Sequence, residues 1–173
     1  MSEGFRQHSY QPPEGATEVI LVRHGESRAA TKENPFPLVD GHGDPELHPN
    51  GEQQAITVGE RLKDEKIDAI YVTSLQRTVQ TAAPLAAHLG MTTRLEADLR
   101  EVCLGEWEGG LLRMKAAAGD PLFVQMQAEE RWDVIPGAES WATLNVRITA
   151  ALGRIHQAHA NRKVVAVVHG GVR

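Results

Sequence analysis

The feature that most constrains the fold is a set of short apolar runs that each end in polar or small residues. Residues 19–22 (Val-Ile-Leu-Val) lead into Arg-His-Gly at 23–25, and the last run leads into His-Gly-Gly at 169–171. Short apolar runs bounded in this way are typical of buried strands. Segments with helical periodicity lie between them, so strands and helices alternate. The alternation predicts an α/β fold with three α/β/α layers, in which helices cover both faces of a mostly parallel sheet.

Local signals place the individual elements. Strands are expected within four segments, residues 19–22, 67–74, 91–101 and 163–171. Helices are expected in residues 50–65, 75–90 and 140–159. Asn50 and Ser74 are typical N-cap residues for the first two helices. Gly90 is expected to end the second helix, and Pro84 to kink it.

The chain divides into a lead-in and one domain. Residues 1–17 are polar and contain Pro12 and Pro13, and they lack the apolar core of a signal peptide, so we expect a flexible N-terminal segment. Residues 18–173 have the length of a single domain. Residues 104–140 fit the alternation least well, because their helical periodicity is weak and is broken by Gly-Asp-Pro. We interpret them as an insertion that covers one edge of the site.

Composition narrows the classes of partner. The net charge of −5 and the absence of a basic block argue against a nucleic-acid partner. No apolar run approaches the roughly 18 residues of a membrane span. The single cysteine, Cys103, excludes an internal disulfide, which suits the cytoplasm, and we interpret it as a small buried side chain. An acidic chain still binds an anion where its cations gather in one cleft.

Polar residues recur at one topological position. Ligands of an open α/β sheet bind at the carboxyl ends of its strands. The expected strands are followed there by Arg23 and His24, by Arg77 one turn into a helix, by Glu101 and by His169. Each residue alone has a simpler structural explanation. Their recurrence at one edge predicts a functional site there.

A competing group of residues lies in the loop that follows the first strand. Asp40, His42, Asp44 and His48 are all of metal-ligating type. Their spacing matches no standard zinc pattern, so a mobile loop is the simpler interpretation and no metal site is predicted.

The three tryptophans, Trp107, Trp132 and Trp141, also admit two interpretations. They either line a substrate pocket or pack in the protein interior, and packing is the commoner role.

Five segments in this order resemble the signature blocks of the histidine phosphatase superfamily, also called phosphoglycerate-mutase-like. They read LVRHGES, DPELHPNGEQQA, VTSLQRTVQTA, LREVCLGEWEG and VVHGG, and together they span nearly the whole expected domain.

The resemblance implies roles for the residues that bind phosphate. His24 corresponds to the family's nucleophile, which forms a phosphohistidine, and its other ring nitrogen then needs an acceptor such as a backbone carbonyl. Arg23 and Arg77 correspond to the residues that hold the phosphoryl oxygens. His169, when protonated by the influence of a bound phosphate, and the backbone N–H of Gly170 would add further donors.

The resemblance also implies an acid. Glu101 occupies the position of the residue that protonates the leaving group and then activates water, and Glu106 and Glu108 are its rivals in sequence. The arginines supply the charge, so the chemistry implied needs no metal and no other cofactor.

Three departures from the family pattern stand out. Ala30 stands where an asparagine often contacts the phosphate, and His48 replaces the usual threonine. The chain ends at Arg173, soon after the last block, so we expect it to lack the family's C-terminal helix. Apolar sheet surface would then be exposed. We therefore expect either lower stability or a partner chain, such as a second copy in a homodimer, that covers this surface.

The resulting hypothesis is hydrolysis of a small phosphomonoester, without identification of the substrate. The short 104–140 region and its GEWEG motif favour the phosphatase branch. The alternatives are a cofactor-dependent phosphoglycerate mutase and a catalytically weak relative that binds a phosphorylated ligand.

Overall fold

The computed structural model describes residues 10–172 and has a parallel sheet at its centre. Four strands pair in the order β1-β6-β4-β5, and all three pairings are parallel. The strands are β1 (Glu18–Arg23), β4 (Ala69–Val72), β5 (Arg94–Leu95) and β6 (Lys163–Val168). Each expected strand is therefore present, although the third is much shorter than the segment that predicted it.

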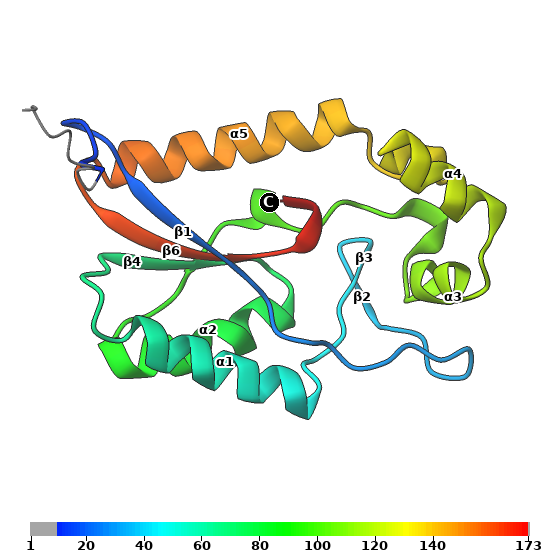
Figure 1. Ribbon diagram of the computed structural model, residues 1–173, viewed down its shortest axis with the longest axis horizontal. Coiled ribbons are helices and arrows are strands. Elements are labelled where there is room, and N and C mark those ends of the chain that lie inside the picture. Colours follow the sequence, from blue (N-terminus) through cyan, green and yellow to red (C-terminus); the bar gives the residue numbers. More distant parts are fainter. Residues whose placement is uncertain (1–9, 173) are drawn as a thin grey trace, which may run out of the picture.

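Helices cover both faces of the sheet (Figure 1). One face carries α1 (Pro49–Leu62) and α2 (Gln76–Leu89), and the other carries α5 (Trp141–Ala158). The expected three layers are confirmed. A short hairpin of β2 (Leu38–Val39) and β3 (His42–Gly43) lies outside the sheet.

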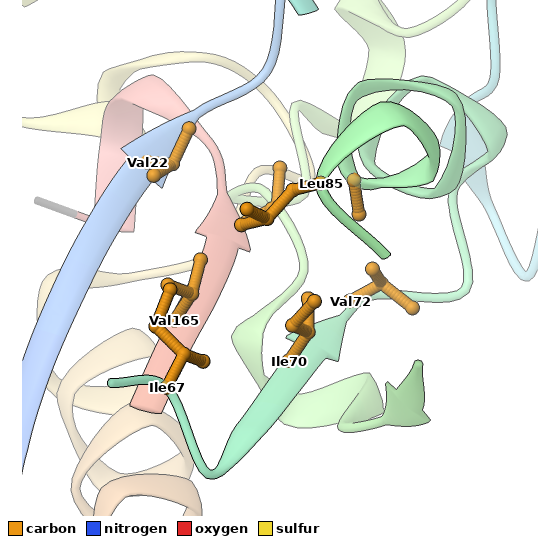
Figure 2. Close-up of a cluster of buried hydrophobic side chains, with 8 residues drawn as sticks. Val22, Ile67, Ile70, Val72, Leu85 and Val165 are labelled. Atoms are coloured by element: carbon orange, nitrogen blue, oxygen red, sulfur yellow. The ribbon is translucent and has the colours of Figure 1, made fainter. Parts of the chain in front are cut away.

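The alternation of side chains along β6 builds two cores. Val165 and Val167 face one cluster, which includes Ile70 and Leu85 (Figure 2), while Val164 packs against α5 in another. Because side chains of a strand point alternately to opposite faces, a central strand covered on both sides must be apolar throughout. This requirement explains the uninterrupted apolar run in the sequence.

The helix starts differ from the sequence-based expectation. Asn50 is not the N-cap of α1, because His48 takes that place and its Nδ1 accepts the Asn50 N–H at 3.2 Å. A proline follows at the first helical position, where its missing N–H costs nothing.

Ser74 does not cap α2. Its hydroxyl is buried without a hydrogen-bond partner among the described residues, and Leu75 is the N-cap. Asp44 instead reaches across from the loop after β3, and its Oδ1 accepts the Gln76 N–H at 2.8 Å. The Asp44 carboxylate, which is distant in sequence, therefore caps the helix in place of the Ser74 hydroxyl. The end of α2 is as predicted, with Gly90 in the left-handed conformation, and the helix continues past Pro84.

The 104–140 segment forms a separate layer of short helices. It contains η2 (Gly105–Trp107), α3 (Leu111–Ala117), α4 (Pro121–Glu129) and η3 (Trp132–Val134). Figure 1 shows α3 and α4 on the side toward which β1 and β6 run. The predicted helix break is confirmed, because α3 ends before Gly119 and Asp120 caps α4. The buried residues Trp107, Met126 and Ile135 give this layer a core of its own.

The two ends of the described chain lie near the sheet. The expected flexible lead-in falls partly outside the described residues, but Gly15 and Thr17 are hydrogen-bonded to Asn161 and His159. At the other end β6 is followed by η4 (Gly170–Val172). Leu21 on the edge strand β1 is 45% exposed. The homodimer stays a prediction.

Among the described residues, no helix is both long and apolar enough to cross a bilayer.

We expect Ile70→Ala to lower the free energy of unfolding by about 2–5 kcal/mol, because it opens a cavity in the cluster between the sheet and α1 and α2. The side chain of Ile70 is 0% exposed, whereas Ile56 on α1 is 46% exposed. The same change at Ile56 should alter it by less than about 0.5 kcal/mol. Urea unfolding of both variants makes the comparison, and equal losses would contradict this account of the core.

Candidate active site

His24 follows β1 and is held by its main chain and its ring. Its backbone N–H donates to the Val168 carbonyl at 3.0 Å, and its Nδ1 lies 2.7 Å from the Gly25 carbonyl. A carbonyl only accepts, so Nδ1 carries the proton and Nε2 keeps a lone pair. The backbone acceptor expected from the sequence is confirmed.

Two glycines bring α1 against the His24 loop. A Cβ on Gly25 would lie 2.5 Å from the Gly51 carbonyl oxygen, and a Cβ on Gly51 would overlap the Glu26 carbonyl. Any side chain at either position would push the loop and the helix apart. The packing therefore fixes the backbone that orients the His24 ring.

His169 lies beside His24 at the end of the neighbouring strand. The two ring centroids are 5.2 Å apart and the rings are tilted by 60°. His169 is fully buried; its Nε2 is 3.0 Å from Thr73 Oγ1, whereas its Nδ1 has no hydrogen-bond partner within residues 10–172. Burial, together with the charge of Arg77, holds the pKa of His169 far below its ordinary value. The protonated donor expected for the phosphate complex is thus neutral here, and only a bound anion would favour its charged form.

Arg77 is buried against the His24 ring. Its Nε donates to His24 Nε2 at 3.2 Å, and its Nη1 donates to the Gly43 carbonyl at 2.8 Å. Burial lowers the pKa of Arg77, while the carboxylates of Glu101 and Asp44 oppose that effect. The guanidinium stays charged, because arginine does not lose its proton in proteins.

Arg23 differs from Arg77 in being exposed, and it makes no intramolecular hydrogen bond or ion pair with its side chain within residues 10–172. It lines the same cavity as His24 and Arg77. The site therefore has one fixed guanidinium and one that is free to turn toward a ligand.

Glu101 shares this cavity, and its carboxyl is tied at one oxygen. Oε1 accepts the N–H groups of Val102 at 3.1 Å and Gly171 at 2.9 Å. Within residues 10–172, Oε2 accepts no hydrogen bond, so it is the oxygen that can exchange a proton with a ligand.

The rival carboxylates are placed differently. Glu106 is exposed. Glu108 lines the cavity, but its Oε1 accepts the Leu104 N–H at 2.8 Å and its Oε2 accepts the Gly43 N–H at 2.7 Å. Both oxygens of Glu108 are therefore used in holding loops together, which leaves Glu101 as the carboxyl best placed for chemistry.

Two adjoining cavities meet at the histidine. The smaller, of about 220 Å³, contains Arg77 and Glu101, and the larger, of about 590 Å³, opens beside it. Arg23, His24 and Arg113 line both of them. Side chains predicted from three of the four strand ends thus line one hollow together with Arg113, whereas His169 lies beside the His24 ring and is not among the residues that line it.

The family model described as "Histidine phosphatase superfamily (branch 1)" matches residues 19–173. The chain belongs to the histidine phosphatase superfamily. Phosphoglycerate mutase-like protein 4 of Arabidopsis thaliana is 41% identical over 159 residues, which cover 90% of this chain and 67% of the relative. Phosphoserine phosphatase 1 of Hydrogenobacter thermophilus is 31% identical, with 88% of this chain and 70% of the relative covered.

Solved structures of the superfamily have the same fold. A mycobacterial glucosyl-3-phosphoglycerate phosphatase superimposes with a TM-score of 0.71 at 26% identity, over 88% of this chain and 73% of that one. A phosphoglycerate mutase from Bacillus anthracis gives 0.69 at 26% identity, over 89% and 75%. The similar structures therefore include both a phosphatase and a mutase.

Arg113 is a site residue that sequence reasoning missed. It projects from α3, and its guanidinium donates to Ser27 Oγ at 2.7 Å and to the Arg28 carbonyl at 2.9 Å. It also lies over the Phe36 ring, 4.9 Å from the centroid. Nothing local distinguishes this arginine in a helix of weak periodicity. Only the path of the 104–140 segment brings it to the cavity.

The departures from the family pattern have structural counterparts. Ala30 lines the larger cavity and packs so closely on Gly110 that a Cβ there would overlap it. His48 lines the same cavity while it caps α1, and its Nδ1 is 3.8 Å from Glu26 Oε1.

The candidate metal ligands have separate structural tasks. Asp40 pairs with Arg100 at 2.9 Å, Asp44 caps α2 and His48 caps α1. His42 Nδ1 lies 3.1 Å from the Asp40 carbonyl oxygen. Between residues 10 and 172, no three side chains of metal-ligating type are grouped.

The tryptophans and the cysteine are not among the residues that line the two cavities beside His24. Trp107 and Trp132 belong to the core of the 104–140 segment, as the packing interpretation predicts, and Trp141 is 60% exposed. Cys103 is partly exposed, so the expectation of a buried side chain is wrong. It lies beside a surface hollow that also contains Arg100 and Arg147.

We expect His24 to titrate far below ordinary histidine. Burial, opposed by the Gly25 carbonyl and reinforced by Arg77 and Arg23, lowers its pKa from 6.5 to about 4. NMR of its ring should show the neutral form down to about pH 5. A midpoint near 6.5 would contradict the desolvated geometry.

The same depressed pKa links His24 to stability. As pH falls, the His24 ring binds a proton in the unfolded chain before it does so in the folded protein. The contribution of the neutral ring to stability is therefore full above about pH 6.5 and is lost as pH falls toward about 4. A His24→Asn variant should therefore lose less stability than wild type between pH 7 and pH 5 in urea unfolding.

Proposed function

We propose that this chain is a metal-independent phosphomonoester hydrolase that acts on a small phosphorylated metabolite through a phosphohistidine. The observation that carries the proposal is the His24 ring, whose Nδ1 is bound to the Gly25 carbonyl at 2.7 Å so that its unprotonated Nε2 faces Arg77 and accepts the Arg77 Nε–H at 3.2 Å. A nitrogen lone pair held beside a guanidinium is what attack on a phosphoryl group requires.

In the first half-reaction, His24 Nε2 forms a bond to phosphorus while the bond from phosphorus to the alcohol oxygen breaks. The electron pair of that bond goes to the leaving oxygen, which takes a proton from Glu101. We assign this proton to Oε2, because Oε1 is held by Val102 and Gly171. A positioned acid of this kind is worth about 10²–10⁴ in rate.

In the second half-reaction, Glu101 takes a proton from water. The water oxygen bonds to phosphorus as the bond to His24 Nε2 breaks, and inorganic phosphate and neutral His24 are regenerated. Atoms and protons balance over the cycle without a metal or another cofactor.

The phosphoryl oxygens would be bound by the cations around His24. Arg23 and Arg77 reach the cavity from β1 and α2, and the Gly170 N–H and His169 lie at the end of β6. Preorganised donors are worth about 10²–10³ each. A bound phosphate dianion would also raise the pKa of His169, so that this ring could donate.

The relatives support hydrolysis more than isomerisation. Two curated relatives are named phosphoserine phosphatases, and a phosphoserine phosphatase from Entamoeba histolytica with bound phosphoserine is 27% identical with a TM-score of 0.69. A mutase remains the second candidate, because the 41% identical relative is named phosphoglycerate mutase-like.

The substrate preference follows from charge. Arg113 adds a further guanidinium to the cavity that contains His24, and we propose that the 104–140 segment, which carries it, covers this edge of the site. Arg113 would bind a second anionic group, such as a carboxylate, on a small phosphomonoester.

We expect wild type to release phosphate from p-nitrophenyl phosphate and His24→Ala to lose activity by more than about a thousandfold. Wild type should also form a base-stable, acid-labile phosphoenzyme that the variant lacks. Equal, slow release by both proteins would instead support a phospholigand-binding protein. Conversion of 3-phosphoglycerate to 2-phosphoglycerate without free phosphate would support the mutase.

We expect Arg113→Met to lower kcat/KM for 3-phosphoglycerate by about tenfold or more, because a charge-assisted hydrogen bond is lost. The value for glycerol 3-phosphate, which lacks the carboxylate, should change much less. Lys115→Met is the matched control, since Lys115 lies on the same helix and pairs with Asp120. Equal losses on both substrates would show that Arg113 does not read the second anion.

A further inference from the structure

The loop that carries Glu101 has little regular structure. Residues 98–103, here called the acid loop, begin within η1 (Ala97–Leu99) and continue without entering a strand. Carbonyl groups in such a segment need partners from elsewhere in the chain. The position of the Glu101 carboxyl depends on those partners.

Arg147 on α5 supplies them. Its Nη1 donates to the carbonyls of Asp98 at 2.6 Å and Arg100 at 2.8 Å, and its Nη2 donates to the Glu101 carbonyl at 2.9 Å. Nε and Nη2 also donate to the two carboxylate oxygens of Glu139, both at 2.7 Å. All five N–H groups of the guanidinium are thereby used.

Glu139 completes the attachment from the other side. Its Oε2 accepts the Cys103 N–H at 3.2 Å, and its own N–H donates to the Cys103 carbonyl at 2.8 Å. The side chains of Arg147 and Glu139 are only 19% and 10% exposed. The pair therefore binds the acid loop on both sides of Glu101, shielded from most of the solvent.

We propose that Arg147, supported by Glu139, is a positioning residue that fixes Glu101 for proton transfer to the leaving group. The inference rests on the proposed function. Arg147 bonds to the main chain of Glu101, whereas the Glu101 carboxyl is held separately by Val102 and Gly171. Loss of the guanidinium would free the acid-loop backbone and leave three carbonyls without their donor.

A displaced acid has a kinetic signature that general loosening lacks. A leaving group that is a weak base departs without help, whereas a strongly basic one needs the proton. A fault in positioning Glu101 should therefore slow reactions of poor leaving groups selectively. A merely structural fault should slow all substrates by one factor.

The test uses 2,4-dinitrophenyl, p-nitrophenyl and phenyl phosphate, whose phenols are progressively weaker acids. We expect Arg147→Met to reduce kcat/KM, which reports the half-reaction in which the leaving group departs, at least about tenfold more for phenyl phosphate than for 2,4-dinitrophenyl phosphate. Glu139→Gln, a milder change that keeps the side-chain shape, should shift the series in the same direction by a smaller factor. It also serves if Arg147→Met does not fold.

Arg154→Met is the matched control. Arg154 lies on the same helix and pairs with the side chains of Glu96 and Asp98, but it does not bond to the acid-loop carbonyls. It should leave the leaving-group dependence as in wild type. The inference is overturned if Arg147→Met lowers kcat/KM equally for all three substrates, or if Arg154→Met gives the same selective loss.

Glu101→Gln separates this inference from the proposed function. It should produce the steepest dependence on the leaving group. If Glu101→Gln shows no such dependence, the assignment of the acid fails and the positioning role fails with it. If Glu101→Gln shows the dependence and neither Arg147→Met nor Glu139→Gln does, only the positioning role is wrong.

Discussion

The hydrogen bond between His24 Nδ1 and the Gly25 carbonyl decides which ring nitrogen faces the cavity. Because a carbonyl cannot donate, the other nitrogen must keep its lone pair, and burial keeps it unprotonated. Rotation of that ring or of the Gly25 peptide would turn a base into a donor. The rest of the site assumes this orientation, since Arg77 donates to Nε2 and His169 packs beside the same ring.

The site also depends on how its positive charges are kept together. Buried cations repel one another and need compensating groups. Arg77 has the Gly43 carbonyl and the nearby Asp44 carboxylate, and Arg147 has Glu139 and three carbonyls. Arg23 has no such internal partner within residues 10–172 and stays exposed. The fold thus compensates the charges of Arg77 and Arg147, which hold loops in place, and leaves Arg23 available for a ligand.

The sequence predicted those parts of the structure that follow from short-range pattern and general topology. Apolar runs located the strands, and the parallel arrangement alone placed Arg23, His24, Arg77, Glu101 and His169 at one edge. The sequence pattern could not predict contacts between segments that are far apart in the chain. Asp44 caps α2 in place of Ser74, and Arg113 reaches the cavity, because of loop paths that no local pattern encodes. The role of Arg147 could not be predicted either, because the sequence does not distinguish a helical arginine that faces solvent from one that donates to five acceptor atoms.

The layer formed by residues 104–140 has an apolar centre separate from the two beside the sheet. The packing of this layer therefore depends little on the strands that carry the histidines. Over evolutionary time such a layer can exchange side chains, lengthen or shorten while the residues at the strand ends stay constant. Because the layer and the catalytic residues can change separately, proteins with this fold are expected to act on different metabolites.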